Sequence, residues 1–323
     1  MKFSEILLSR LNRPENKGDD FGYTNQANQN SKRVINKDGS FNLVRVGEKT
    51  SLYHTLVTMP WWYFLLVIIS TYVVVNMFFA GVYLLVDFNG IGMTTDYKVT
   101  NHFLIASFFS VQTLTTVGYG SLYPLSAIVS MVASIEALTG LMIFAIFTGL
   151  MYGRFSKPYH GIRFSKKMVY APYKQNHALM FRIANERNHN LTELEARILM
   201  SVIVQENGKS TRRYQVLELE NNRITYFPLN WTLVHYIDEK SPLYGMAKSD
   251  FENTDLEMLI MIKGYNETAA QSIHAKSSYH ASEITWNAKF TLPYYFREDG
   301  VTVFELDKID EYETVPAVSA VAN

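Results

Sequence analysis

The sequence predicts two domains: an all-α membrane domain with two spanning helices and a re-entrant segment, followed by an all-β sandwich. Three observations point to this division. Two stretches, 61–86 and 125–151, are long and almost free of charge, a shorter apolar stretch lies between them, and short alternating strands dominate after residue 161. A chain of 323 residues has room for both domains.

The composition excludes several classes of function. Lysines plus arginines and aspartates plus glutamates number 30 each, so no net charge attracts nucleic acid. The chain has no cysteine, which excludes disulfides, cysteine-ligated metal sites and thiol catalysis. It also carries no H-E-x-x-H motif and no nucleophile motif. We therefore expect a protein that is not an enzyme and that has no organic cofactor.

Residues 1–46 are expected to form a flexible cytoplasmic tail. Their most polar part, residues 14–33, has few large apolar side chains to bury. No apolar core segment or cleavage site follows the first methionine, so we do not expect a secretory signal peptide.

The stretch 61–86 is expected to cross the membrane. Its 26 residues carry no charge and, as a helix, exceed the roughly 30 Å of a bilayer core. Trp61, Trp62 and Tyr63 stand at one end, where membrane proteins place an aromatic belt. A buried helix of a soluble protein is the alternative, and so long an uncharged run argues against it.

The second span, 125–151, contains a single charge, Glu136. Lysines and arginines number nine in residues 1–60 and five in residues 152–170, whereas the loop 87–101 holds only Lys98. The positive-inside rule therefore places both termini in the cytoplasm.

The stretch 102–114 lies between the spans and is only about 20 Å long as a helix, too short to cross the bilayer. We expect it to be a pore helix that enters from the outer side. The run TTVGYG, residues 115–120, follows it directly. Non-helical backbone at membrane depth is tolerated only where it is buried in protein or lines a water-filled path.

The run TTVGYG has the composition of backbone that lines an ion path. Its two glycines reach positive φ without a steric penalty, and their alternation with larger residues can aim successive carbonyls the same way. TVGYG is identified as the filter loop of potassium channels, by match of the sequence itself. One chain supplies one loop, so a pore requires several chains. The expected filter consists of Thr115, Thr116, Val117, Gly118, Tyr119 and Gly120, with K⁺ held at Thr116 to Tyr119.

After residue 161 the pattern changes to short strands separated by polar turns. Apolar alternation predicts strands at 178–187, 196–207, 212–220, 231–237 and 256–264. Several strands at this spacing are typical of a β-sandwich. No G-x-G-x-x-G fingerprint occurs after residue 160, which argues against a channel gated by calcium or nucleotide through a βαβ domain.

Four further segments resemble the inward-rectifier potassium channel family, in particular its bacterial branch. They are SLYHTLVTMPWW (51–62), EALTGLMIFAIFTGLMYGRFSKP (136–158), PLNWTLVHYIDEKSPLYG (228–245) and AKSSYHASEITWNAKF (275–290). The resemblance implies a homotetramer in the bacterial inner membrane. It also implies an amphipathic slide helix at 47–60, a pore domain at 61–152, a linker at 153–160 and a cytoplasmic immunoglobulin-like gating domain at 161–323.

The resemblance assigns a gate to the second span. Phe144, Thr148 and Tyr152 are four residues apart and therefore form one stripe on a helix. Helix packing alone would explain the spacing, but Tyr152 matches the family's bundle-crossing position, where four rings can close the pore. Phe144 matches a position at which strongly rectifying members carry Asp or Asn, so block by Mg²⁺ or polyamines is expected to be weak.

Glu136 and Gln112 are expected to support the filter. Glu136 lies about 160° round the helix from Tyr152 and so faces the pore helix, and a charge inside a span is a functional candidate. Binding of a blocking cation is its alternative role. Gln112 stands where eukaryotic members carry a glutamate paired with an arginine, and Leu122 replaces that arginine. The support would then come through Glu136, Tyr123 and Pro124.

Bases after the second span are expected to face anionic lipids. The family's longer basic run after Pro158 is interrupted here by Tyr159 and His160, so phosphoinositide activation is doubtful and the sign of lipid regulation stays open. His54 and His160 are candidates for pH-sensitive gating. The expected lipid-facing bases are Arg154, Lys157, Lys166 and Lys167.

Two alternatives to a channel agree less well with these motifs. A membrane-anchored sensor or binding protein whose β-domain is the active part would not need a filter sequence, and no motif supports an enzyme. Potassium flux that Ba²⁺ blocks would separate the three.

Overall fold

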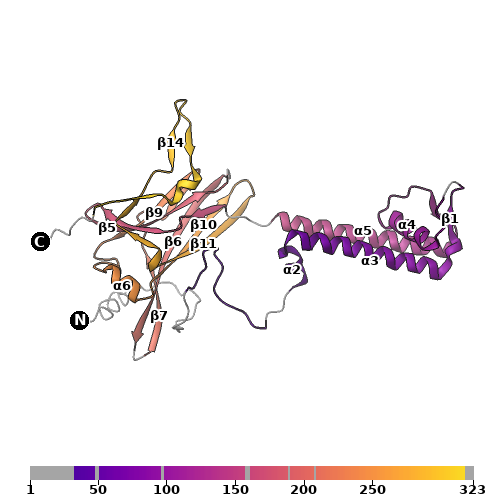
Figure 1. Cartoon of the computed structure of the whole chain (residues 1–323), viewed down its shortest axis with the longest axis horizontal. Helices are drawn as coiled ribbons and strands as arrows, with labels where there is room; N and C mark the ends of the chain where they lie inside the picture. Colours follow the sequence, from indigo (N-terminus) through magenta and orange to yellow (C-terminus); the bar gives the residue numbers. More distant parts are fainter. Residues whose placement is uncertain are drawn as a thin grey trace. The chain divides into compact units, whose positions relative to one another are not determined.

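The computed structural model describes residues 33–47, 51–95, 98–156, 161–187, 190–206 and 209–316. The chain divides into two compact units, which we describe separately (Figure 1). The membrane unit is Val46–Lys157. The β-domain combines Met1–Arg45 with Pro158–Asn323.

The membrane unit contains two long helices, α3 (Trp61–Asp87) and α5 (Ala127–Phe155). Each is about 40 Å long at 1.5 Å per residue, and both are long and apolar enough to cross a membrane. Ser126 sets the start of α5, because its side chain accepts a hydrogen bond from Val129 N. The two expected spans coincide with these helices apart from their ends.

Two shorter helices accompany the spans. Helix α4 (His102–Leu114) has the bounds expected for the pore helix. Helix α2 (Leu52–Thr58) is shorter than the slide helix expected at 47–60, and residues 48–50 lie outside the described residues. It ends where Met59 adopts the extended conformation that a following proline favours.

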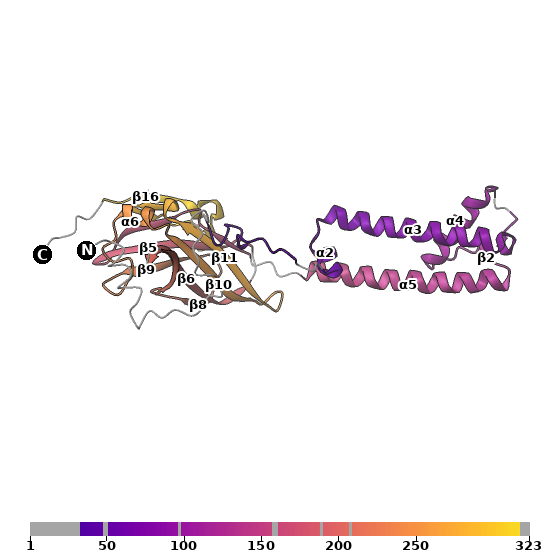
Figure 2. The same cartoon turned by 90° about the horizontal axis from the view of Figure 1, so that it is seen from below.

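Helix α4 packs between α3 and α5 (Figure 2). Its buried face contributes Ile105, Ala106 and Phe109 to an apolar cluster that also contains Tyr83 of α3 and Val129 of α5. The segments on either side of α4 meet in an antiparallel ladder of β1 (Ile91–Met93) and β2 (Leu122–Pro124), after the short helix η2 (Phe88–Gly90). Both ends of the re-entrant segment are therefore held together.

The β-domain is a sandwich of two sheets. The first sheet has the strand order β11-β10-β6-β7, with β8 also paired to β6. Its strands are β6 (Leu191–Glu206), β7 (Lys209–Leu217), β8 (Arg223–Tyr226), β10 (Glu257–Asn266) and β11 (Gln271–His280). The second sheet has the order β12-β4-β5-β3, with β9 paired to β5. Its strands are β3 (Ile162–Phe164), β4 (Met168–Tyr173), β5 (Asn176–Asn185), β9 (Asn230–Ile237) and β12 (Ile284–Trp286).

The core lies between these sheets. Ile198 and Met200 of β6 face Phe181 and Leu233 of the other sheet within one continuous apolar cluster. Smaller elements complete the domain: α6 (Lys248–Asn253), η3 (Ala281–Glu283), η4 (Leu306–Asp310), the pair β13 (Ala288–Phe290) and β16 (Tyr312–Thr314), and the hairpin β14 (Tyr294–Phe296) and β15 (Thr302–Phe304). The sandwich expected from the alternating pattern is confirmed.

A segment before the membrane unit also belongs to the β-domain. We call residues 33–45 the strap. Val34 and Ile35 are buried in a cluster with Leu199 of β6 and Leu259 of β10, on the face of the first sheet that points away from the core. The expected flexible tail is therefore wrong for this part of residues 1–46, while residues 1–32 lie outside the described residues.

Backbone groups of the strap find partners on the same sheet. The Glu257 carboxylate accepts hydrogen bonds from Val34 N at 3.0 and 2.8 Å and from Ile35 N at 3.4 Å. The Ser278 hydroxyl donates to the Ile35 carbonyl. Glu257 is itself fully buried, with an Arg212 nitrogen 3.8 Å away. The strap thus supplies hydrogen-bond donors to a buried carboxylate.

Candidate functional site

The TTVGYG run has an alternating backbone. Thr116, Gly118 and Gly120 have φ values of 59°, 56° and 81°, whereas Val117 and Tyr119 between them are not in the positive-φ region. Such alternation can turn successive carbonyls toward one side, whereas a regular strand points them to opposite sides. A threonine at positive φ is uncommon and costs about 1–3 kcal/mol. Such strain persists where the surrounding structure fixes the backbone for a function.

Helix α4 fixes where the run begins. Asn101 caps the helix by accepting hydrogen bonds from Phe103 N and Leu104 N. At the other end, Val117 N donates to the Gln112 carbonyl at 3.0 Å, so the first residues of the run are tied to the last turn of α4. The helix carries about half a negative charge at this end, which favours a cation near the run.

The side chains of the run are exposed in a single chain. Val117 is 51% exposed and Tyr119 is 78% exposed, although both are large and follow a largely buried helix. Non-helical backbone at membrane depth is tolerated only where protein covers it or where it lines a water-filled path. The run is therefore one part of a larger site.

Glu136 lies behind α4, on the packed face of α5. Its carboxylate is fully buried and accepts hydrogen bonds from the Ser110 hydroxyl of α4 and the Tyr83 hydroxyl of α3. Ser110 also lies 3.1 Å from the Asn76 side-chain oxygen of α3. One acidic residue thus connects three helices. Glu136 faces the pore helix, as its angular position in the sequence indicated, while a role in supporting the run stays a prediction.

Four further residues pack close to α4 or to the ladder of β1 and β2. A Cβ added to Gly140 would be 2.0 Å from the Leu114 carbonyl oxygen, so α5 approaches the end of α4 as closely as only glycine allows. Gln112 is buried, and its Oε1 atom has no hydrogen-bond partner within the described residues. Leu122 is buried in the apolar cluster around α4. Tyr123 packs against Gly92, where a Cβ would meet its ring at 2.4 Å.

The expected gate stripe lies on the opposite face of α5. Phe144 and Tyr152 are 71% and 74% exposed, and the Thr148 hydroxyl bonds only to its own helix, at the Phe144 carbonyl. The other face of the last turns, with Leu150 and Arg154, is buried. The structure therefore brings the three stripe residues together on a surface that faces away from the packed helices.

Arg154 is not the lipid-facing base that the sequence predicted. It is buried and donates to the carbonyls of Leu56 and Met59, at 2.6 and 2.7 Å, at the C-terminus of α2. Its guanidinium also lies 4.6 Å from the Trp61 ring centroid and 4.5 Å from that of Phe64. Terminal helix carbonyls lack partners and carry partial negative charge, so a cation there is favourable. Arg154 therefore fastens α2 to α5.

The other bases that the sequence predicted to face lipid have different surroundings. Lys166 is exposed; its ammonium lies 3.5 Å from the Asp310 carboxylate, and its backbone N–H donates a hydrogen bond to the same carboxylate at 2.7 Å. Lys167 is exposed, with its ammonium 5.9 Å from the Tyr312 ring centroid. Lys157 and His160 lie outside the described residues. His54 is exposed on α2.

Sequence reasoning missed the two partners of Glu136, Tyr83 and Ser110, and it also missed Asn76, which contacts Ser110. Asn76 carried a usable signal, because an amide in the middle of an apolar span needs a partner. Gly140 also carried one, since it lies four residues after Glu136 and so on the same face of the helix. The tyrosine and serine types are too common in spans to single out.

Comparison with known proteins covers both units. The family model described as "Inward rectifier potassium channel C-terminal domain" matches residues 162–323, and the model described as "Ion channel" matches residues 62–157. The inward rectifier potassium channel Kirbac3.1 of Paramagnetospirillum magnetotacticum is 34% identical over 285 residues, which cover 86% of this chain and 95% of the relative.

More distant similarity extends to animals. The G protein-activated inward rectifier potassium channel 2 of Mus musculus is 27% identical over 322 aligned residues, covering 89% of this chain and 74% of the relative, and the protein of that name from Homo sapiens gives the same values. Both units of the chain, and the order in which they occur, thus agree with one family. The chain belongs to the inward rectifier potassium channel family, and it is an ion channel and not an enzyme.

Proposed function

We propose that four copies of the chain surround one axis and conduct K⁺ through their TTVGYG runs. The alternating φ values at Thr116, Gly118 and Gly120 carry this proposal, because they allow a column of carbonyls to replace the hydration shell of a cation. The exposed side chains of the run would be covered by the neighbouring copies. The proposed ligands of K⁺ are the carbonyls of Thr116, Val117, Gly118 and Tyr119.

The proposal gives Glu136 and Gln112 a supporting role. Glu136 restrains Ser110 in the middle of α4, and Gly140 lets α5 contact the end of the same helix. Gln112 sits one turn before the run, and its backbone carbonyl holds Val117 N. Displacement of α4 would displace the carbonyl column. These contacts therefore affect conduction by holding α4 in place, and they do not touch the ion themselves.

The gate is proposed at Tyr152, with Phe144 and Thr148 lining the same path. Exposure of these side chains in the single chain supports it, because four copies of one exposed aromatic stripe can meet at an axis. Phe144 offers no charge to Mg²⁺ or a polyamine, so block at this position would be weak. Arg154 lies two residues from Tyr152 and links the gate region to α2.

The setting proposed for the channel is the bacterial inner membrane, with both termini in the cytoplasm. The excess of bases outside the loop 87–101 supports this orientation. The β-domain would then gate the pore from the cytoplasm. Regulation by anionic lipids is part of the proposal. Arg154 is engaged by α2 and Lys166 is paired with Asp310, which leaves Lys167 as the exposed base without a carboxylate partner among the three that are described.

A flux measurement tests the proposal. The purified protein in liposomes should give K⁺ flux that Ba²⁺ blocks, and Gly118→Ala should abolish it, because alanine is strained at a φ of 56°. Gly245→Ala is the matched control: this glycine has a φ of 70°, its Cβ would meet no atom within 4 Å, and it lies in the β-domain. Full flux from Gly118→Ala would refute the proposed filter.

A further inference from the structure

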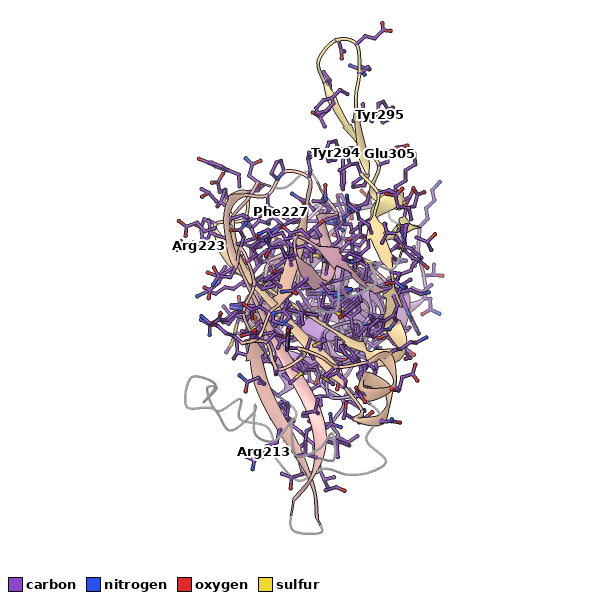
Figure 3. The ribbon with its side chains drawn as sticks, turned by 90° about the vertical axis from the view of Figure 1, so that its left-hand side faces the viewer. Arg213, Arg223, Phe227, Tyr294, Tyr295 and Glu305 are labelled. Atoms are coloured by element: carbon purple, nitrogen blue, oxygen red, sulfur yellow. The ribbon has the colours of Figure 1, made fainter. Side chains whose placement is uncertain are left out.

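A polar pocket in the β-domain is lined by elements of both sheets. Its cavity measures about 310 Å³, at the lower end of the range for small-molecule sites. The turn between β4 and β5 contributes Lys174, the segment after β7 contributes Glu220, and β9 contributes Tyr236. In Figure 3 the labels Arg213 on β7 and Arg223 on β8 mark the two sides of the stretch that contains Glu220.

The ammonium of Lys174 is held at this pocket by a carboxylate and two aromatic rings. It forms an ion pair with Glu220, whose carboxylate also accepts a hydrogen bond from the Tyr173 hydroxyl at 2.8 Å. The ammonium lies 5.2 Å from the Tyr173 ring centroid and 5.9 Å from that of Tyr236. A cation within about 6 Å of a ring centroid is attracted by the ring. We call Glu220, Tyr173 and Tyr236 the cage, and the lysine shows how a cationic head is seated in it.

The turn that carries Lys174 does not itself favour a lysine. Tyr173 pairs with Asn176, so Lys174 and Gln175 form a two-residue hairpin turn. Lys174 has a φ of 53°, a value for which such turns favour glycine or asparagine. Strain of this kind is found where a residue serves a function. The contact of the ammonium with the cage is an interaction that can account for a lysine at this position.

The ion pair in the cage is exposed enough to be displaced. The side chains of Lys174 and Glu220 are 56% and 32% exposed. Exposed pairs contribute little net free energy and are weakened by salt. The hydrogen bond from Lys174 lowers the pKa of Glu220, so the carboxylate stays charged at neutral pH. A cation from solution can therefore take the place of the ammonium without leaving a buried charge unpaired.

The rest of the lining also favours a cation. Besides Lys174 and its partner, the pocket is lined by the carboxylates of Glu218 and Asp238 and by the ammonium of Lys240, which leaves one negative charge in excess. One oxygen of Asp238 already accepts two backbone N–H groups of the following turn. In the described part of the chain, no group of three His, Asp or Glu side chains is arranged to hold a metal ion. An organic cation therefore fits this lining better than an anion or a bare metal ion.

We propose that this pocket binds a small organic cation with a guanidinium or primary ammonium head, which replaces the Lys174 ammonium in the cage. The head pairs with Glu220 and contacts the Tyr236 ring. Val216 and Leu219 line the same cavity and accommodate a short carbon chain. The site goes beyond the proposed pore, and its test does not depend on conduction.

Competition for the cage can be measured on the unchanged chain. The full-length protein in detergent is acylated with an N-hydroxysuccinimide ester, and mass spectrometry follows each lysine. Ethylguanidinium chloride is the probe, because a guanidinium head stays protonated and does not react with the ester. The hydrogen bond to Glu220 raises the pKa of Lys174, which slows its acylation. We expect the probe to accelerate acylation of Lys174 at least threefold over sodium chloride of equal ionic strength, and to leave the exposed Lys289 of β13 unchanged.

Two variants show whether the effect arises in the cage. Glu220→Gln removes the charge that attracts both cations, so Lys174 should be acylated faster and the probe should no longer change its rate. Lys174→Asn removes the competing ammonium without straining the turn, since asparagine tolerates positive φ. A saturation-transfer NMR titration should then give a dissociation constant for ethylguanidinium at least tenfold lower than in the unchanged chain, and adding Glu220→Gln should remove this gain.

Three results would overturn the proposal. The rate at Lys174 would follow ionic strength alone, or the probe would accelerate Lys174 and Lys289 equally, or binding to Lys174→Asn would persist after Glu220→Gln is added. The first two are measured on the unchanged chain, so the proposal stays falsifiable if a variant does not fold.

Discussion

At the scale of single residues, Glu136 determines how α4 is held in the membrane unit. Its carboxylate accepts two hydroxyl hydrogen bonds in a place from which water is excluded. Replacing it by leucine removes the acceptor for both hydroxyls, and each buried group left unpaired costs about 1–3 kcal/mol. We expect Glu136→Leu to lower both the thermal stability of the detergent-solubilised protein and its K⁺ flux in liposomes.

Two companion variants test this explanation. Glu136→Gln keeps an acceptor oxygen of the same reach and should retain most of the stability. Thr139→Val removes a hydroxyl that bonds only to the Ile135 carbonyl of its own helix, so it should change little. If Glu136→Leu melted and conducted like the unchanged chain, the carboxylate would not be holding α4.

His235 gives the β-domain a dependence on pH. Its Nδ1 is 2.6 Å from the Glu218 carbonyl, which can only accept, so Nδ1 carries the hydrogen. In the neutral ring Nε2 then accepts from the Ser241 hydroxyl at 2.9 Å. Burial lowers the pKa of His235 below its usual 6.5, and the contact with the Glu218 carbonyl opposes this only in part.

The sign of the pH effect follows from this lowered pKa. The unfolded chain binds the proton first as pH falls, so the contribution of His235 is complete above pH 6.5 and is lost below it. Hydrogen exchange of residues 231–246 should be faster, after correction for intrinsic rates, at about pH 5.5 than at about pH 7.5. His235→Gln should remove this difference, whereas the same change at the exposed His274 should leave it. An unchanged difference in His235→Gln would assign the effect to another group.

At the scale of elements, the sequence predicts the helices of the membrane unit well. Long uncharged runs have few alternatives to spanning helices, and the bounds of α4 follow from Asn101 as its cap and the TTVGYG run after it. The sequence also predicts longer strands such as β5, which is buried along most of its length, and β9, whose burial alternates. The strands β12 to β16 were not predicted, because three residues carry too little pattern to distinguish a strand from a loop.

Contacts between elements account for what the sequence could not predict. Arg154 has the pattern of an interfacial base, and only the return of α2 toward α5 brings the Leu56 and Met59 carbonyls within its reach. The strap is polar by composition, and its partner Glu257 is 223 positions from Val34. Neither hydrophobic periodicity nor motif spacing can predict a contact between residues so far apart in the sequence.

Gly140 provides a test of element packing. Alanine there would place a Cβ 2.0 Å from the Leu114 carbonyl, so α5 and the end of α4 must separate. We expect Gly140→Ala to reduce K⁺ flux in liposomes at least tenfold. Gly81→Ala is the matched control within α3, where a Cβ meets no atom within 4 Å and alanine favours the helix by about 1 kcal/mol. Wild-type flux from Gly140→Ala would mean that this close approach does not position the run.

At the scale of the whole molecule, the strap joins the two units in sequence. It is held on the β-domain by apolar burial and by Glu257, and a few residues later the chain enters α2, which Arg154 fastens to α5. Each attachment is non-covalent and local.

Attachment of the strap can be measured by proteolysis. Ile35→Asp would place a carboxylate against Leu199 and Leu259 and beside the buried Glu257, so the strap should detach while the sandwich core remains intact. We expect trypsin to cleave after Lys37 at least tenfold faster in this variant, because a docked backbone resists the extended conformation that proteases require.

The control for this prediction lies in the same strap. Val44 is 91% exposed, so Val44→Asp adds the same charge without removing a buried group, and its cleavage rate at Lys37 should match that of the unchanged chain. Equal rates in all three proteins would show that burial of Ile35 does not hold the strap. The Glu257 hydrogen bonds to Val34 would then be sufficient, and Glu257→Ala would be the variant that exposes Lys37.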